Sequence, residues 1–276
     1  MLRRHTILTR GIVCRFCCNR LVNIDTGDLM TLEQFFIDNP KVALAFSGGV
    51  DSAFLLYAAI KYKADVCAYY VKSDFQPQFE LDDAKRLAEE LSANMKIINV
   101  DVLADETIAA NPSNRCYYCK RTIFGTILEQ AAADGYTVIL DGTNASDDEG
   151  DRPGMVALRE LQVKSPLREC GLTKAKIREL SKEAGLFTWD KPAYACLATR
   201  IATGEMITRE KLIATEKSES FLFEMGFTDF RVRRINDMAK LQFKGDQLEK
   251  AINNREVILN EMKKYYSSVV IDMEVR

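Results

Sequence analysis

Histidine is almost absent from this sequence, and so are long apolar runs and a strong net charge. The one histidine, His5, lies near the start of the chain, so elsewhere no imidazole is close in sequence to activate a nucleophile. No run of about 18 apolar residues occurs, which excludes a transmembrane helix. The formal net charge of −2 argues against a large nucleic-acid footprint. With 276 residues, 47% of them hydrophobic, the chain is long enough to form two globular domains.

Cysteine is plentiful by comparison. Eight cysteines stand at irregular spacing, at positions 14, 17, 18, 67, 116, 119, 170 and 196. In a chain of this length such spacing argues against a disulfide framework and favours metal binding or catalysis for a subset of them. Cys67 lies in the apolar stretch DVCAYYV and is predicted to be a core residue. Cys170 has no comparable context and is predicted to be structural.

The first 29 residues differ in composition from the rest. They contain five arginines and three cysteines, and no acidic residue before Asp25. The segment lacks the apolar core of a secretory signal. Cys14 and Cys17 have the spacing of half a zinc site, but no second half follows nearby. We expect residues 1–29 to be a disordered leader or a misassigned start, with Met30 as the functional start and Thr31 and Gln34 capping the first helix.

From residue 41 onward, apolar runs typical of buried strands alternate with stretches that have helical apolar spacing. Strands are predicted at residues 41–46, 65–72, 95–102 and 136–142, and helices at 51–64, 79–93 and 120–135. This alternation predicts an α/β fold with a doubly wound parallel sheet. Ligands of such sheets bind beyond the carboxyl ends of the strands, where the loops of interest here all fall.

The first of these loops is SGGVDS, residues 47–52, which lies between a predicted strand and a predicted helix. Gly48 and Gly49 allow a tight turn whose amides point at an anion, and the start of the helix adds its positive dipole end. The hydroxyls of Ser47 and Ser52 complete an oxyanion cradle, and Asp51 is a candidate magnesium ligand. No Gly-Lys-Ser/Thr follows, so this is not the loop of enzymes that transfer the γ-phosphoryl group. The alternative is an ordinary strand–helix turn.

This loop resembles the pyrophosphate loop (PP-loop) of the N-type ATP pyrophosphatases, which have an adenine nucleotide alpha hydrolase-like fold. LDGTNASD, residues 140–147, resembles the second nucleotide loop of that family, with Gly142 and Thr143 at the ATP. The resemblance implies that ATP is cleaved between its α- and β-phosphates, that a substrate oxygen is adenylated, and that AMP is later displaced.

Two further cysteines, Cys116 and Cys119, are spaced so that both sulfurs can reach one metal, and Cys196 in KPAYACLATR is a third candidate. Three thiolates can hold an iron–sulfur cluster with one iron open. Alternatively, Cys196 acts alone as a nucleophile on the adenylated carbon. Two half-buried cysteines beside an aromatic pair are the structural alternative for Cys116 and Cys119.

The residues from about Met30 to the C-terminus resemble the ATP-dependent sulfur transferases of the lactate racemase nickel-pincer cofactor pathway. The match is carried by DGTNASDDEGDRPG, by SPLRECGLTKAKIRELSKEAGLFTWDKPAYACLATRI and by FRVRRINDMAKLQF. The family substrate is pyridinium biscarboxylic acid mononucleotide, whose carboxylates become thiocarboxylates. In one branch a cysteine that corresponds to Cys196 gives up its own sulfur, and in another three cysteines bind a 4Fe–4S cluster. Having Cys116, Cys119 and Cys196, this chain resembles the cluster branch, in which a metal, or the nearby Arg200, holds Cys196 as a thiolate.

The C-terminal third is predicted to form a small α+β domain from residue 191 to residue 276, after a PP-loop domain over residues 30–190. Alternation in FRVRRI places Arg231 and Arg233 on one strand face, where a shared anion is a reason for their proximity. In the resembling family such arginines bind the substrate phosphate, whereas the alternative is a solvated strand face. Glu216 or Glu219 is a weak match to an acidic metal site of the family. The usual His-Gly after the arginine strand is missing here.

Two other functions stay open. A tRNA-thiolating enzyme also combines this loop with C-x-x-C and a distant cysteine, but it would carry a basic face or an RNA-binding module. A non-enzymatic zinc or iron–sulfur protein would leave the loop unexplained. We expect a cytoplasmic homo-oligomer that binds a small mononucleotide, ATP and Mg²⁺, with no nucleic-acid or membrane partner, and with a nickel-inserting enzyme downstream.

Overall fold

The computed structural model describes residues 30–147 and 153–275. The predicted leader, with its zinc half-site at Cys14 and Cys17, therefore lies outside the described residues, as do residues 148–152. The first helix, α1, spans Leu32–Asp38, and the Thr31 side chain accepts a hydrogen bond from the Gln34 amide at 3.2 Å, as its sequence predicts. None of the described helices is long and apolar enough to cross a membrane.

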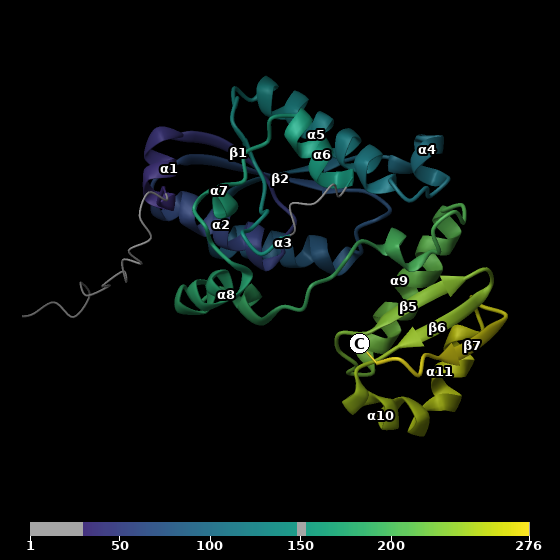
Figure 1. Cartoon of the computed structure of the whole chain (residues 1–276). Coiled ribbons are helices and arrows are strands. Elements are labelled where there is room, and N and C mark those ends of the chain that lie inside the picture. Colours follow the sequence, from purple (N-terminus) through teal and green to yellow (C-terminus); the bar gives the residue numbers. More distant parts are fainter. Residues whose placement is uncertain (1–29, 148–152, 276) are drawn as a thin grey trace, which may run out of the picture.

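Four parallel strands form the first sheet, in the order β3-β2-β1-β4. Their bounds are Lys41–Ala45 for β1, Asp65–Lys72 for β2, Asn94–Asn99 for β3 and Ile139–Leu140 for β4. The connecting helices are α2 (Val50–Lys61), α3 (Gln78–Glu90), α4 (Glu106–Ala109), α5 (Arg115–Ala133), α6 (Pro153–Glu160), α7 (Pro166–Glu169) and α8 (Lys174–Glu183). Figure 1 shows helices on both sides of the sheet, which confirms the predicted doubly wound α/β fold.

The strands divide their side chains between two cores because successive residues of a strand point to opposite faces. On one face, Val42 and Leu44 of β1 pack with apolar residues of α1, α2, α3 and α8. On the other face, Ala43 packs with Cys67 of β2 and with residues of α5 and α6. Cys67 is fully buried, which confirms its predicted place in the core.

A second, smaller sheet lies at the C-terminal end of the chain, as Figure 1 shows. Its order is β5-β6-β7, with bounds Arg231–Ile235, Met238–Gln242 and Ser268–Ile271. Helices α9 (Arg209–Glu224), α10 (Leu248–Asn253) and α11 (Arg255–Met262) accompany it. In the turn between β5 and β6, Asn236 has φ 51°, a conformation that asparagine tolerates. A tight turn therefore forms here although the expected His-Gly pair is missing.

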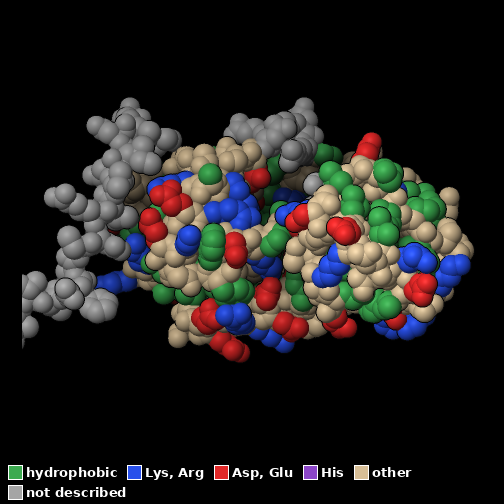
Figure 2. Space-filling model, turned by 90° about the horizontal axis from the view of Figure 1, so that it is seen from below, with side chains coloured by type: hydrophobic (Ala, Val, Ile, Leu, Met, Phe, Trp, Pro, Cys, Tyr) green, Lys and Arg blue, Asp and Glu red, His purple; other side chains and the backbone are tan. Residues whose placement is uncertain are grey.

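The two parts of the chain share an apolar cluster. Phe75, Val102 and Ile108 from the first part pack with Leu197, Ala198, Ile201, Ile207 and Leu212 from the second. The predicted division at residue 190 stays a prediction, and the segment that carries Cys196 lies at this junction. On the face seen in Figure 2, basic and acidic side chains are interspersed.

Candidate active site at the carboxyl ends of the parallel strands

The glycine loop, residues 47–52, joins β1 to the start of α2. Gly48 has φ 71°, and a Cβ there would lie 3.1 Å from Ala84 Cβ and 3.2 Å from Ala84 Cα. Any side chain at this position would therefore strain the backbone and press against α3. Gly49 then caps α2, so the loop amides lie at the positive end of a helix of 12 residues.

Hydroxyl groups converge inside this loop. Ser47 Oγ lies 3.1 Å from Ser52 Oγ, and the amides of Ser47 and Gly49 reach these hydroxyls at 3.3 and 3.4 Å. Bonds of this length are weak, so a phosphate oxygen can replace them at little cost. Ser47, Gly49 and Ser52, which the sequence singles out, thus lie within hydrogen-bond distance of one another.

The second loop follows β4 and touches the first. A Cβ on Gly142 would lie 3.0 Å from the Ser52 amide nitrogen, so only glycine allows this approach. Thr143 is buried and donates from both its amide and its hydroxyl to the Asp141 carboxylate, which also accepts from Ser165 at 2.7 Å. Asp141 thus orders the loop, and Gly142 holds it against the start of α2.

Asp51, the candidate magnesium ligand, forms an ion pair that its sequence context does not reveal. Lys174 Nζ at the start of α8 lies 2.5 Å from Asp51 Oδ2, and Asn144 Nδ2 lies 3.5 Å from Oδ1. Burial raises the pKa of Asp51 above its usual value, and Lys174 opposes this shift. The carboxylate is thus held next to the glycine loop with a cation already beside it.

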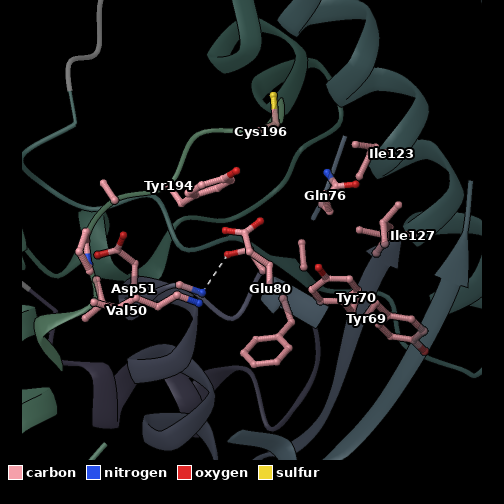
Figure 3. A pocket seen from close by; sticks show the side chains of 18 of the residues that line it. Val50, Asp51, Tyr69, Tyr70, Gln76, Glu80, Ile123, Ile127, Tyr194 and Cys196 are labelled. Atoms are coloured by element: carbon pink, nitrogen blue, oxygen red, sulfur yellow. Dashed lines mark hydrogen bonds between the residues drawn. The ribbon is translucent and has the colours of Figure 1, made fainter. Parts of the chain in front are cut away.

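A cavity of about 410 Å³ connects the glycine loop with Cys196. Ser47, Gly49 and Asp51 line one part of it, and Cys196 lines another. Three cations also border it, namely Lys174, Arg178 and Lys191. In the view of Figure 3, Tyr194 and Glu80 lie between Asp51 and Cys196. The structure therefore brings the glycine loop and the thiol of Cys196, which lies 145 positions after Asp51, into one cavity.

Arginines hold the backbone on both sides of Cys196. We call residues 191–200 the cysteine segment. The backbone carbonyl oxygens of residues 191, 193, 195, 196, 198 and 199 accept hydrogen bonds from arginine guanidinium groups. The donors are, in chain order of the acceptors, Arg178, Arg231, Arg200 (to both 195 and 196), Arg115 and Arg233. The Leu197 amide donates to Phe75 O at 2.9 Å. The backbone of this segment is thus fixed from both parts of the chain.

Cys116, Cys119 and Cys196 are neighbours. Cys116 and Cys119 lie in the first turns of α5, one helical turn apart, and Cys119 and Cys196 border the same apolar cluster. Burial, together with the neighbouring thiols of Cys196 and Cys116, raises the pKa of Cys119 to about 12. Burial also raises the pKa of Cys196, against the effect of Arg115. Without an added cation these two thiols are therefore neutral at pH 7.

Comparison with known proteins identifies the family. Residues 41–113 match the model of the queuosine biosynthesis protein QueC. The uncharacterized protein slr1717 of Synechocystis is 33% identical over 89% of this chain and 93% of its own length. Pyridinium-3,5-bisthiocarboxylic acid mononucleotide synthase of Lactiplantibacillus plantarum is 33% identical over 77% of this chain and 78% of its own. The chain belongs to the PP-loop family of ATP-dependent sulfur transferases.

A PP-loop sulfur transferase is an ATP-utilising enzyme. The glycine loop lies within the residues that match the QueC model and is the predicted PP-loop. The tRNA-specific 2-thiouridylase MnmA 1 of Clostridium botulinum is a more distant relative, 29% identical over 54% of this chain and 52% of its own. The likeness to the mononucleotide synthase thus covers more of the chain than the likeness to this tRNA enzyme does.

In this PP-loop enzyme Arg200 has a partner other than the one we expected. Its guanidinium is buried and pairs with the Glu219 carboxylate through Nε–Oε1 at 2.8 Å and Nη2–Oε2 at 3.1 Å. Its charge is therefore largely balanced, and its main contribution near Cys196 is to the backbone. Glu219 is equally buried and committed to this pair, and Glu216 accepts from the Gln78 amide at 2.6 Å.

Neither glutamate belongs to a ready-made metal site. Across residues 30–147 and 153–275, no three His, Cys, Asp or Glu side chains converge closely enough to hold one ion. This includes Cys116, Cys119 and Cys196, whose thiols are neighbours without meeting at a single point.

Arg231 and Arg233 both point towards the cysteine segment. Arg231 is buried and donates to Ala193 O at 2.7 Å, and Arg233 donates to Thr199 O at 3.0 Å and to Gln242. The alternative of a solvated strand face does not fit Arg231, which is 5% exposed. Their predicted role in binding a phosphate stays a prediction.

Proposed function

We propose that the enzyme adenylates a carboxylate of pyridinium biscarboxylic acid mononucleotide and converts it to a thiocarboxylate. The observation that carries this proposal is the single cavity lined by both the PP-loop and Cys196. A carboxylate activated at the loop can meet its sulfur donor there without leaving the protein. The printed activity of the Lactiplantibacillus plantarum relative, a bisthiocarboxylic acid mononucleotide synthase, supports this substrate class.

ATP is the activating substrate in this proposal. The amides and hydroxyls of residues 47–52 bind its phosphates, with help from the positive end of α2. Lys174, Arg178 and Lys191 supply positive charge along the cavity. The site fits Mg²⁺, since Mg²⁺ is commonly held by one or two carboxylates together with substrate phosphates. Asp51 would hold it, with Lys174 shifting from the carboxylate to a phosphate oxygen.

For the sulfur step we propose a 4Fe–4S cluster held by Cys116, Cys119 and Cys196. The donor set fits, because three thiols lie near one another and one of them lines the cavity. The thiolates of a cluster bind different irons, so they need not converge on one point as the ligands of a single ion must. When bound, the cluster would supply an open iron that carries an exchangeable sulfide. The alternative is that Cys196 gives up its own sulfur once.

Arg231 and Arg233 are the proposed ligands of the mononucleotide phosphate. Both reach the cysteine segment, so a phosphate held by them would place the substrate ring next to Cys196. Guanidinium groups suit this task because their paired donors match phosphate oxygens. The protein otherwise provides orientation, since the arginines fix the segment's carbonyls and the PP-loop fixes the nucleotide.

The decisive experiment is an anaerobic incubation of reconstituted protein with ATP, Mg²⁺, sulfide and the biscarboxylic acid mononucleotide. Pyrophosphate, AMP and more than one thiocarboxylate per chain are expected, with no change in protein mass. Accumulation of ADP and phosphate would contradict the assignment to adenylation. Asp51→Ala should lower the rate of pyrophosphate release, because Mg²⁺ would lose a ligand.

Single serine variants separate the two sulfur sources. Cys116→Ser, Cys119→Ser and Cys196→Ser should each lose both the visible absorbance of a cluster and multiple turnover. Cys170→Ser is the matched control, since Cys170 packs against the main core away from the cavity. If Cys116→Ser and Cys119→Ser stay active while the wild-type chain loses the mass of one H₂S, about 34 Da, the cluster proposal fails. Cys196 is then the consumed donor.

A further inference from the structure

Glu80 is an acidic side chain of the cavity for which the proposed mechanism has so far no use. It lies in the first turn of α3, and Figure 3 shows its carboxylate in the cavity next to Tyr194. Among the described residues that line the cavity, Asp51 and Glu80 are the two with carboxylates. Asp51 is paired with Lys174. By contrast, in the part of the chain that the structure describes, no basic nitrogen lies within ion-pair distance of Glu80.

The sulfur step has to dispose of a proton. When a thiol or hydrosulfide attacks the activated carboxylate, a C–S bond forms. The bond between the acyl carbon and the oxygen that bridges to phosphorus breaks, and AMP leaves with that oxygen and the electron pair. The S–H proton must pass to a base, and no oxidant or reductant takes part. We infer that Glu80 accepts this proton, directly or through one water molecule in the cavity, and then releases it to solvent. This inference rests on the proposed function.

The other polar groups of the cavity are poorly suited to this task. Burial raises the pKa values of the Tyr70 and Tyr194 phenols far above neutrality, so both are neutral hydroxyls that accept protons weakly. Lysine and arginine side chains offer only donors. Asp51 lies at the PP-loop, where it pairs with Lys174 and is the proposed ligand of Mg²⁺. Glu80 remains as the carboxylate that is open to the space between the loop and Cys196.

The surroundings of Glu80 also set its proton affinity in the useful range. Burial raises its pKa to about 7, close to the pH at which a general base works best. Charged and titratable groups face it from β2, α3, the cysteine segment and η3 (Leu197–Arg200), and these are Lys72, Tyr70, Asp83, Lys191, Tyr194 and Arg200. Lys191 and Arg200 attract its charge, but each is paired elsewhere, with Asp83 at 2.7 Å and with Glu219.

The test measures two half-reactions of the full-length, reconstituted protein between pH 5.5 and 8.5. Pyrophosphate release reports adenylation, and thiocarboxylate formation reports sulfur transfer. Sodium sulfide is added so that the concentration of HS⁻ stays constant at every pH, because H₂S itself loses a proton in this pH range. In the wild type, sulfur transfer should fall about tenfold per pH unit below pH 7, while pyrophosphate release should not. Glu80→Gln should slow sulfur transfer about 100-fold or more, leave pyrophosphate release within about twofold, and remove the acidic limb.

Two further variants guard against a structural explanation. Glu89→Gln makes the same change on an exposed position of the same helix and should behave as wild type. Glu80→Asp keeps a carboxylate and should retain part of the sulfur transfer together with an acidic limb. The inference is overturned if Glu80→Gln slows both half-reactions equally, raises the Mg²⁺ requirement, or keeps the acidic limb. If wild-type protein releases no pyrophosphate at all, it is the proposed function that fails.

Discussion

Replacing Glu219 with glutamine should be one of the most destabilising single changes in this enzyme. The Arg200 and Glu219 side chains are only 1% and 2% exposed, and two parallel hydrogen bonds join them. Glu219 also accepts from the Val232 amide at 2.9 Å and from the Tyr194 hydroxyl. Glutamine has nearly the same size but no charge, so the guanidinium would stay buried without its counter-ion.

The expected loss of unfolding free energy is about 3–5 kcal/mol, the range seen when one partner of a buried pair is removed. That is a large part of the total stability of a protein of this size. It corresponds to a fall in Tm of roughly 6–20 °C, at about 2–4 °C per kcal/mol. Urea unfolding followed by circular dichroism measures the free energy, and differential scanning calorimetry measures Tm.

Asp101→Asn is the matched control. Asp101 pairs with Arg209 at 2.6 Å, a similar distance, but both side chains are 52% exposed. Solvent screens such a pair, so this acid-to-amide change should cost at most about 1 kcal/mol. If Glu219→Gln cost no more than Asp101→Asn, burial of the pair would not govern its contribution, and the reasoning given for Arg200 would be wrong.

Three further predictions concern the site. Gly48→Ala should reduce pyrophosphate release and raise the KM for ATP, because φ 71° and the contact with Ala84 strain the loop; an unchanged KM would separate this loop from ATP binding. Arg231→Ala and Arg233→Ala should each raise the KM for the mononucleotide about 10- to 150-fold, the equivalent of about 1.5–3 kcal/mol for a charged hydrogen bond, and an unchanged KM in both would leave them as anchors of the backbone only. The pKa of Glu80 is about 7 in the folded protein and about 4.5 in the unfolded chain, so the wild type loses stability as pH rises between these values. The unfolding free energy of Glu80→Gln, measured with urea, should therefore rise by about 1–3 kcal/mol relative to wild type between pH 4.5 and pH 8, and equal pH dependence would contradict the raised pKa.

Much of the fold could be predicted from local patterns. The predicted strand at residues 41–46 and the predicted helix at 79–93 agree with β1 and α3 to within a few residues. Both were predictable because the spacing of apolar residues indicates which face of an element is buried. The fourth strand was expected over residues 136–142 but spans only Ile139–Leu140, since it lies at the sheet edge and pairs with β1 alone among the named strands. The helix expected at 120–135 begins earlier, at Arg115, so that Cys116 and Cys119 are helical.

The parts of the site whose residues are close together in the sequence were the easiest to predict. The glycine loop has all its parts within six positions, and its shape depends on them directly. The ion pair of Asp51 with Lys174 joins residues 123 positions apart, and no local sequence pattern around either residue indicates its partner. Glu80 was missed for the same reason, because the cavity that it lines is completed by Tyr194 and Lys191, which come from a distant segment. The partner of Arg200 likewise depends on how α9 packs.

The arginines that surround Cys196 donate hydrogen bonds to main-chain carbonyl oxygens, and every residue type has the same carbonyl group. These hydrogen bonds therefore do not depend on the side chain at residue 196. Serine, alanine or a side chain that has lost its sulfur leaves all of these acceptors in place. Such an arrangement tolerates chemical change at one atom, which is a useful property in a protein that handles sulfur, whether the atom is a permanent ligand or is given away.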